Sequence, residues 1–188
     1  MFSSKSVNQY LVVILGLAIL VAALAIAYFG QRGGEQNNNQ LTSIIDFDSC
    51  AAAGFPIAES YPPQCRTSDG RSFSQDIGNE LDKIDLIRIT SPRPNDTIAS
   101  PLLITGEARG TWYFEASFPI QLFDANDNLV STTVAQAQSD WMTENFVPFQ
   151  AQLFFSQPDT AQGYLLLKKD NPSGLPENDD QLRVPVIF

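Results

Sequence analysis

The side chains that most often carry enzymatic chemistry are scarce in this chain. Its 188 residues include no histidine, so the commonest general base, the commonest zinc ligand and the usual third member of a nucleophilic triad are missing. Glu107 and Glu115 offer a carboxylate pair for glycoside hydrolysis, but they fall on neighbouring predicted strands and not in an evident cleft. The sequence therefore predicts a protein that is not an enzyme and that needs no cofactor.

One short segment, residues 124–128 (DANDN), has side-chain oxygens at a spacing that suits a calcium ion. It resembles the calcium linker motif of cadherins, and its first, third and fifth positions fit the start of an EF-hand loop. The EF-hand pattern then fails, because Leu129 stands where glycine is needed and Ala135 where glutamate is needed. The prediction is a polar hairpin turn, since Asn and Asp suit turn geometry. The alternative is a calcium site, whose ligands would be Asp124, Asn126, Asp127 and Asn128.

The chain has two cysteines, Cys50 and Cys65, in a short proline-containing stretch without a visible core. A disulfide between them would stabilise this stretch by roughly 3 kcal/mol through loop closure. We predict this disulfide; the alternative is two free thiols in a reducing compartment. Two cysteines without histidine leave zinc short of ligands. Asp69-Gly70 predicts a tight hairpin turn, and the Cys…Asp-Gly-x-x-Phe arrangement is similar to small secreted inhibitor modules, which carry several more cysteines.

A third group of residues is of the types that dominate protein interfaces. Arginine and tryptophan are enriched at binding hot spots, and loops at the end of a β-sandwich are natural places for them. We nevertheless expect Trp112 and Trp141 to cap a hydrophobic core, as aromatic residues in small sandwiches usually do, and a recognition patch is the alternative. The possible partner-binding residues are Arg109, Trp112, Tyr113 and Trp141.

The elements that must position these residues are strands. Apolar residues alternate with polar ones in two runs, so each run presents one apolar face to a facing sheet. Pro119, Pro148 and Pro185 cannot donate to a strand ladder and should mark edges or bulges. We predict an all-β fold, an immunoglobulin-like antiparallel β-sandwich of about seven strands. The predicted strands are Leu86–Thr90, Leu102–Ala108, Phe114–Phe123, Leu129–Ala137, Val147–Phe155, Gly163–Lys169 and Leu182–Ile187.

The same C-terminal part, about residues 84–188, resembles a known family. The residues that carry the likeness are Ser91-Pro92 with Ser100-Pro101, Gly106-Glu107-Ala108-Arg109, Trp112-Tyr113-Phe114-Glu115-Ala116, Asp140-Trp141-Met142-Thr143, Phe146-Val147-Pro148-Phe149 and Val184-Pro185-Val186. In this order they are similar to Gmad2, the immunoglobulin-like domain associated with bacterial spore germination proteins. The resemblance implies a sandwich fold, an envelope setting and no catalytic residues.

The N-terminal part contains a predicted membrane anchor. Residues 10–29 are apolar and uncharged, and about 20 such residues cross a bilayer as a helix. A cleaved signal peptide is the alternative. We predict that residues 1–9 are cytoplasmic, that residues 30–40 form a flexible linker, and that residues 41–83 form a small disulfide-stapled segment ahead of the immunoglobulin-like domain at 84–188.

Net charge completes the functional prediction. A formal charge of −10 argues against a nucleic-acid partner, because phosphates would be repelled. We predict a single-pass protein of a bacterial-type cell membrane whose extracytoplasmic part is a non-enzymatic binding or structural module, with an envelope protein or cell-wall partner. The alternatives are a calcium-dependent adhesion module, or a minor envelope glycan-acting enzyme or inhibitor.

Overall fold

The computed structural model describes residues 43–188, which fall into two compact units that divide between Gln75 and Asp76. The predicted cytoplasmic residues 1–9, membrane helix 10–29 and linker 30–40 lie outside the described residues. Within residues 43–188, no helix has both the length and the apolar character that a membrane crossing requires.

The smaller unit is a helix fastened to a three-stranded antiparallel sheet. Helix α2 (Phe47–Ala52) is followed by β1 (Ile57–Ala58), β2 (Gln64–Arg66) and β3 (Ser72–Ser74), in the order β1-β2-β3. The predicted disulfide is confirmed: Cys50 of α2 is bonded to Cys65 of β2, with Cα atoms 6.1 Å apart. Both cysteines are fully buried with Ile44, so the disulfide occupies the centre of this small core.

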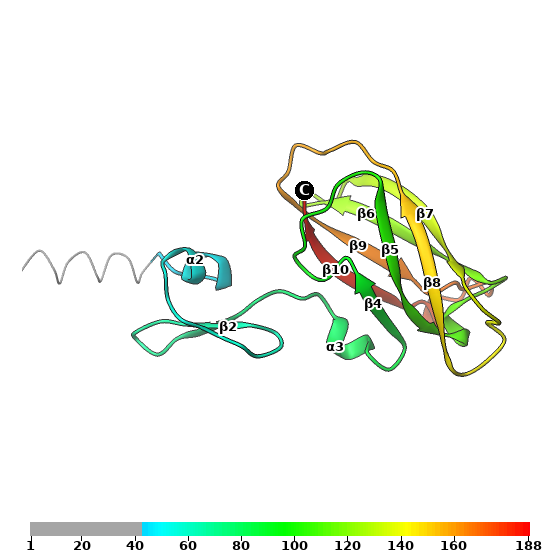
Figure 1. Ribbon diagram of the computed structural model, residues 1–188, viewed down its shortest axis with the longest axis horizontal. Coiled ribbons are helices and arrows are strands. Elements are labelled where there is room, and N and C mark those ends of the chain that lie inside the picture. Colours follow the sequence, from blue (N-terminus) through cyan, green and yellow to red (C-terminus); the bar gives the residue numbers. More distant parts are fainter. Residues whose placement is uncertain (1–42) are drawn as a thin grey trace, which may run out of the picture. The chain divides into compact units, whose positions relative to one another are not determined.

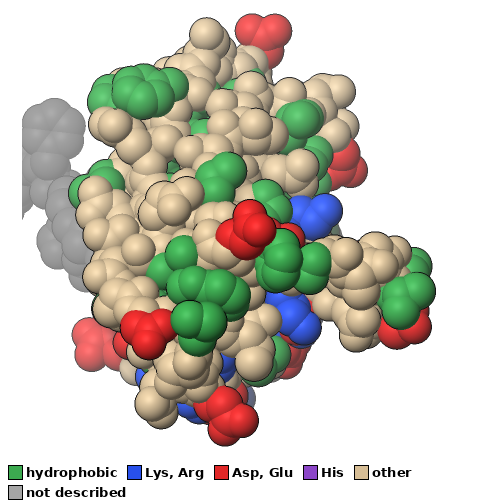
Figure 2. Space-filling view, turned by 90° about the vertical axis from the view of Figure 1, so that its right-hand side faces the viewer, with side chains coloured by type: hydrophobic (Ala, Val, Ile, Leu, Met, Phe, Trp, Pro, Cys, Tyr) green, Lys and Arg blue, Asp and Glu red, His purple; other side chains and the backbone are tan. Residues whose placement is uncertain are grey.

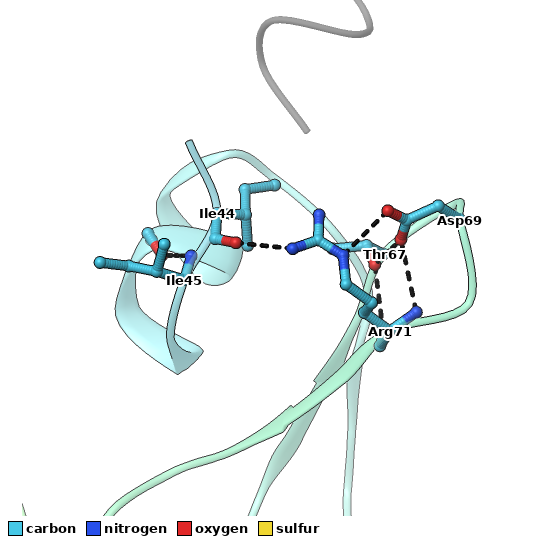
Figure 3. Close-up of polar contacts among 6 residues, drawn as sticks. Ile44, Ile45, Thr67, Asp69 and Arg71 are labelled. Carbon is cyan, nitrogen blue, oxygen red and sulfur yellow. Dashed lines mark hydrogen bonds and ion pairs between the residues drawn. The ribbon is translucent and has the colours of Figure 1, made fainter. Parts of the chain in front are cut away.

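The predicted hairpin turn at Asp69-Gly70 joins β2 to β3 (Figure 3). Gly70 has φ +90°, a conformation that glycine adopts without a side-chain clash. Asp69 accepts hydrogen bonds from the Thr67 hydroxyl and from the Arg71 guanidinium, and these contacts, that of Thr67 above all, lower the pKa of Asp69. Arg71 also donates to the carbonyl of Ile44 at 2.8 Å, which ties the turn to the segment before α2.

The larger unit contains seven antiparallel strands, and each overlaps one predicted strand. Their bounds are β4 (Ile87–Ser91), β5 (Leu102–Arg109), β6 (Ser117–Asp124), β7 (Leu129–Ala137), β8 (Phe146–Leu153), β9 (Gln162–Lys168) and β10 (Gln181–Ile187). The strand order is β10-β9-β6-β7-β8-β5-β4, and the arrangement can be followed in Figure 1.

The seven strands form one continuous, nearly closed sheet. The sequence predicted instead a sandwich of two sheets with about seven strands, the number found in immunoglobulin domains of the constant type. In a constant-type domain the fourth strand belongs to the sheet of the fifth. Here β7 pairs with β6 from Gln136 to Leu129 and with β8 only at Gln136 and Ala137. Further along β7, the hydroxyls of Thr133 and Ser131 donate to carbonyls of the segment that contains β8, at 2.9 and 2.7 Å. A backbone bridge between Thr97 and Ile187 nearly closes the other seam.

The core lies between the two layers of this folded sheet and follows the predicted alternation. In β8, Val147, Phe149, Ala151 and Leu153 are buried while the residues between them are exposed. In β6 the alternation holds from Phe118 onward. The predicted start of that strand at Phe114 is wrong, because Glu115 and Ala116 have φ of 50° and 64° and turn the chain before the strand begins at Ser117.

Residues 76–83, which the sequence grouped with the cysteine segment, pack on the sheet of the larger unit. Helix α3 (Glu80–Lys83) follows Asn79, whose amide accepts from the Arg183 backbone N–H at 2.7 Å and donates to the Gln181 carbonyl at 3.0 Å. The buried carboxylate of Glu80 is held by Arg93 at 2.6 Å. The hydrogen bonds from Asn79 to β10 and the Glu80–Arg93 ion pair therefore make residues 76–83 part of the larger unit.

Candidate functional site

Three loops meet at one end of the larger unit, the right-hand end in Figure 1. The first loop contains the 3-10 helix η1 (Gly110–Trp112) and runs to β6; the others are residues 138–145 and residues 169–180, which include η2 (Pro176–Asn178). The Gly110 N–H donates to the Asn145 carbonyl at 3.1 Å, and the Asp170 N–H donates to the Trp112 carbonyl at 3.0 Å. The first loop is therefore bonded to both others, and the three form one continuous surface.

Gly110 fixes how closely the first two loops approach. A Cβ atom at this position would overlap the backbone carbonyls of Trp141 and Thr143. Because those atoms belong to the main chain, they cannot move aside as a flexible side chain would. Glycine is therefore the residue that allows residues 138–145 to lie directly on η1.

Arg109 is the last residue of β5, next to the first loop, and its guanidinium makes two hydrogen bonds and one contact with an aromatic ring. Its guanidinium donates to the carbonyls of Asp85 at 2.9 Å and Glu144 at 3.2 Å, and it lies 4.1 Å from the centre of the Phe146 ring. The guanidinium of Arg88 lies at the same distance from that ring. Arg109 thus joins the second loop to the segment before β4, and two of its donors bond to carbonyls within the domain.

Trp112 and Tyr113, two of the possible partner-binding residues, are core residues. Their exposed fractions are 2% and 4%. The Tyr113 hydroxyl donates to the Val147 carbonyl at 2.7 Å, its ring packs edge-on against Phe118 at 5.2 Å, and burial raises the pKa of Tyr113 far above its ordinary value. The indole N–H of Trp112 is buried and has no acceptor among the described residues. The interpretation that Trp112 caps the core is the one that the structure supports.

Trp141 also packs against the core and is only partly exposed, so the apolar surface of the loops comes from other residues. Each loop exposes one large apolar side chain: Phe114 (41%), Met142 (77%) and Leu175 (51%). Figure 2 looks onto this end and shows hydrophobic side chains interspersed with acidic ones. Sequence reasoning missed all three residues as site residues, although Phe114 and Met142 directly follow predicted ones.

The calcium candidate lies in the β6–β7 connection and forms a closed polar turn, as predicted. The Asp124 carboxylate accepts from the N–H groups of Asn126 and Asn128, both at 2.8 Å, and from the Asn128 side-chain amide at 2.9 Å. These hydrogen bonds, that of the Asn128 side chain first, lower the pKa of Asp124. Asp127 accepts from the Tyr164 hydroxyl at 2.7 Å. The carboxylates of Asp124 and Asp127 therefore already accept from protein donors. Residues 43–188 contain no group of three or more acidic, cysteine or histidine side chains arranged to hold a metal.

The carboxylate pair considered for glycan chemistry is divided between a strand and a loop. Glu107 lies in β5 and forms an ion pair with Arg88 at 3.1 Å on a solvent-facing surface. Glu115 is exposed in the first loop, after η1. The two carboxylates are therefore carried by different elements, and one of them is engaged in an ion pair.

The larger unit has the seven antiparallel strands expected of an immunoglobulin-like domain. Residues 86–174 match the family model of Gmad2, described as the immunoglobulin-like domain of bacterial spore germination, and this part of the chain is a Gmad2 domain. The match begins beside β4 and ends within the third loop, so β10 lies beyond it. No curated protein and no solved structure matches the chain.

Proposed function

We propose that this protein is a membrane-anchored, extracytoplasmic binding module of a bacterial-type cell envelope, and that its Gmad2 domain contacts an envelope partner through the three-loop end. The observation that carries the proposal is that these loops are bonded into one surface and that each exposes a large apolar side chain. A contiguous exposed apolar patch rimmed by polar residues typically marks an interaction site on a folded domain, whereas single exposed apolar residues do not.

The opposite end of the domain is tied together by backbone hydrogen bonds. There, the N–H groups of Asn95 and Ile98 donate to the carbonyls of Pro185 and Ile187, both at 2.8 Å. Phe155 packs edge-on against Phe188 at 6.0 Å, and the β6–β7 connection is the closed turn around Asp124. Phe154 (64%) and Leu129 (53%) are exposed near that end, so a control position there tests whether apolar exposure alone attracts a partner.

The extracytoplasmic location is supported by the disulfide and by the apolar run at residues 10–29. Structural disulfides persist in oxidising compartments, and an uncleaved apolar segment of this length anchors a protein in the membrane. The location is tested on intact cells with a membrane-impermeant maleimide. Cys50 and Cys65 should be labelled only after an impermeant reductant is added. Labelling that requires cell lysis contradicts the proposed orientation.

The binding surface is tested by photo-cross-linking in cells that express the full chain. A photoreactive amino acid is placed at Met142 and, as the matched control, at Gln157, which is exposed in the connection after β8. We expect a discrete cross-linked adduct from position 142 and none from position 157. Equal adducts from both positions, or none from position 142, contradict the proposed surface.

A further inference from the structure

The acidic side chains of the three-loop end indicate what chemistry its partner has. The loops expose the carboxylates of Glu115, Asp140, Glu144, Glu177 and Asp179. None of these five forms an ion pair with a described lysine or arginine. Lys169 is the only basic residue within the three loops, and it stands at the edge where β9 ends.

Charge and apolar surface are combined on the same loops. Glu115 follows Phe114, Asp140 lies two residues before Met142, and Glu177 lies two residues after Leu175. Within two residues of each exposed apolar side chain, its own loop therefore carries an acidic residue that forms no ion pair with a described lysine or arginine. A partner that covers this end must therefore present apolar side chains for contact and positive charges to balance the carboxylates.

Building on the proposed binding role, we propose that the three-loop end binds a cationic amphipathic polypeptide segment, one that presents lysine or arginine beside apolar side chains. Anionic lipid headgroups and anionic wall polymers are repelled by the same carboxylates. Oppositely charged protein surfaces are attracted by them, and this attraction steers association and suppresses wrong partners. Met142, an unbranched and flexible side chain, can adapt its contacts to such a segment.

The test measures binding of the full chain to two synthetic helical peptides by fluorescence anisotropy, one of leucine and lysine and one of leucine and glutamate. The loop variants are Met142→Ser, and a set that removes charge but keeps hydrogen-bonding shape: Glu115→Gln, Asp140→Asn, Glu144→Gln, Glu177→Gln and Asp179→Asn. The matched controls at the opposite end are Phe154→Ser and Asp159→Asn, which alter an exposed apolar and an exposed acidic residue. Circular dichroism verifies that each variant is folded.

The leucine–lysine peptide should bind the unaltered chain, and Met142→Ser should weaken it by about tenfold, as expected for loss of a buried interface contact. The charge set should weaken it more and reduce its salt dependence, while the controls leave it within about twofold. Equal weakening by the controls shows general attraction to an acidic protein and overturns the proposal. Preference for the leucine–glutamate peptide, or no binding of either, overturns it as well. An adduct from position 142 in cells without peptide binding would leave the binding surface in place and refute only this partner chemistry.

Discussion

Reduction of the Cys50–Cys65 disulfide should unfold the smaller unit and leave the Gmad2 domain folded. The bond closes a loop with a sequence separation of 15 residues, which in the chain-entropy model stabilises by about 3 kcal/mol. The buried core of this unit consists of Ile44 and the two cysteines themselves, with partly buried aromatic residues around them. A core this small supplies only a few kcal/mol, so losing the disulfide removes a large part of the unit's stability.

The measurement is hydrogen–deuterium exchange of the full chain with and without a phosphine reductant. A loss of about 3 kcal/mol raises the population of opened molecules by roughly 100-fold, and amides in the β2–β3 pairing should exchange faster by up to that factor. Amides in the larger unit should keep their protection, because it contains neither cysteine and forms a separate compact unit.

A double variant, Cys50→Ser with Cys65→Ser, serves as the control. It should exchange quickly in the smaller unit without reductant, and adding the reductant should change nothing further. Unchanged exchange of residues 43–75 after complete reduction would refute the reasoning, because it would mean that the helix and the three short strands hold together without the bond.

Three further changes probe the larger unit by urea denaturation. Arg93→Met should destabilise it by about 2–3 kcal/mol, because it removes the guanidinium that pairs with the buried Glu80 carboxylate; part of the loss is offset by solvent near the half-exposed arginine, and a change below about 0.5 kcal/mol would contradict this role. Tyr113→Phe should cost about 1–2 kcal/mol by removing the hydroxyl that bonds the Val147 carbonyl, and an unchanged midpoint would show that the bond contributes nothing. The folded-state pKa of Asp124 is depressed, so the carboxylate stabilises the fold above the unfolded pKa of about 3.9, and this contribution is lost as the pH falls through the folded value. Asp124→Asn should therefore lower the free energy of unfolding at pH 7, and below about pH 4 the stability of the variant should fall less steeply with pH than that of the unaltered chain.

The strands were predictable because the core is built from period-two alternation. Phe118, Ile120 and Leu122 in β6 and Phe149 and Leu153 in β8 are buried as that pattern requires. The continuous sheet was not predicted, because β7 pairs along its length with β6 and reaches β8 only at Gln136 and Ala137, and the apolar alternation does not encode such partial pairing. The role of α3 was hidden for a similar reason, since residues 76–83 read as a polar connector and their bonds to β10 span about a hundred residues.

The candidate partner-binding residues named from the sequence lie in or beside two of the three loops, but they are not the most exposed side chains there. Residue type indicated arginine and tryptophan, yet two Arg109 donors bond to carbonyls within the domain and Trp112 is buried. Type alone does not tell which way a side chain turns when a strand ends and a loop begins. Whether Met142 and Leu175 are exposed depends on the path of the loop backbone, and the residue types alone do not predict that path.

The aromatic run Trp112-Tyr113-Phe114 shows how one loop serves both stability and exposure. The first two rings are buried in the core, Phe114 stays 41% exposed, and Glu115 and Ala116 with positive φ then turn the chain towards β6. If the loop end binds as proposed, buried anchors beside the exposed ring would lower the entropy lost on binding. Stability and binding should therefore separate along this run: substitution of Trp112 or Tyr113 destabilises the fold, whereas Phe114→Ser should leave the unfolding midpoint nearly unchanged and weaken only contacts made at the loop end.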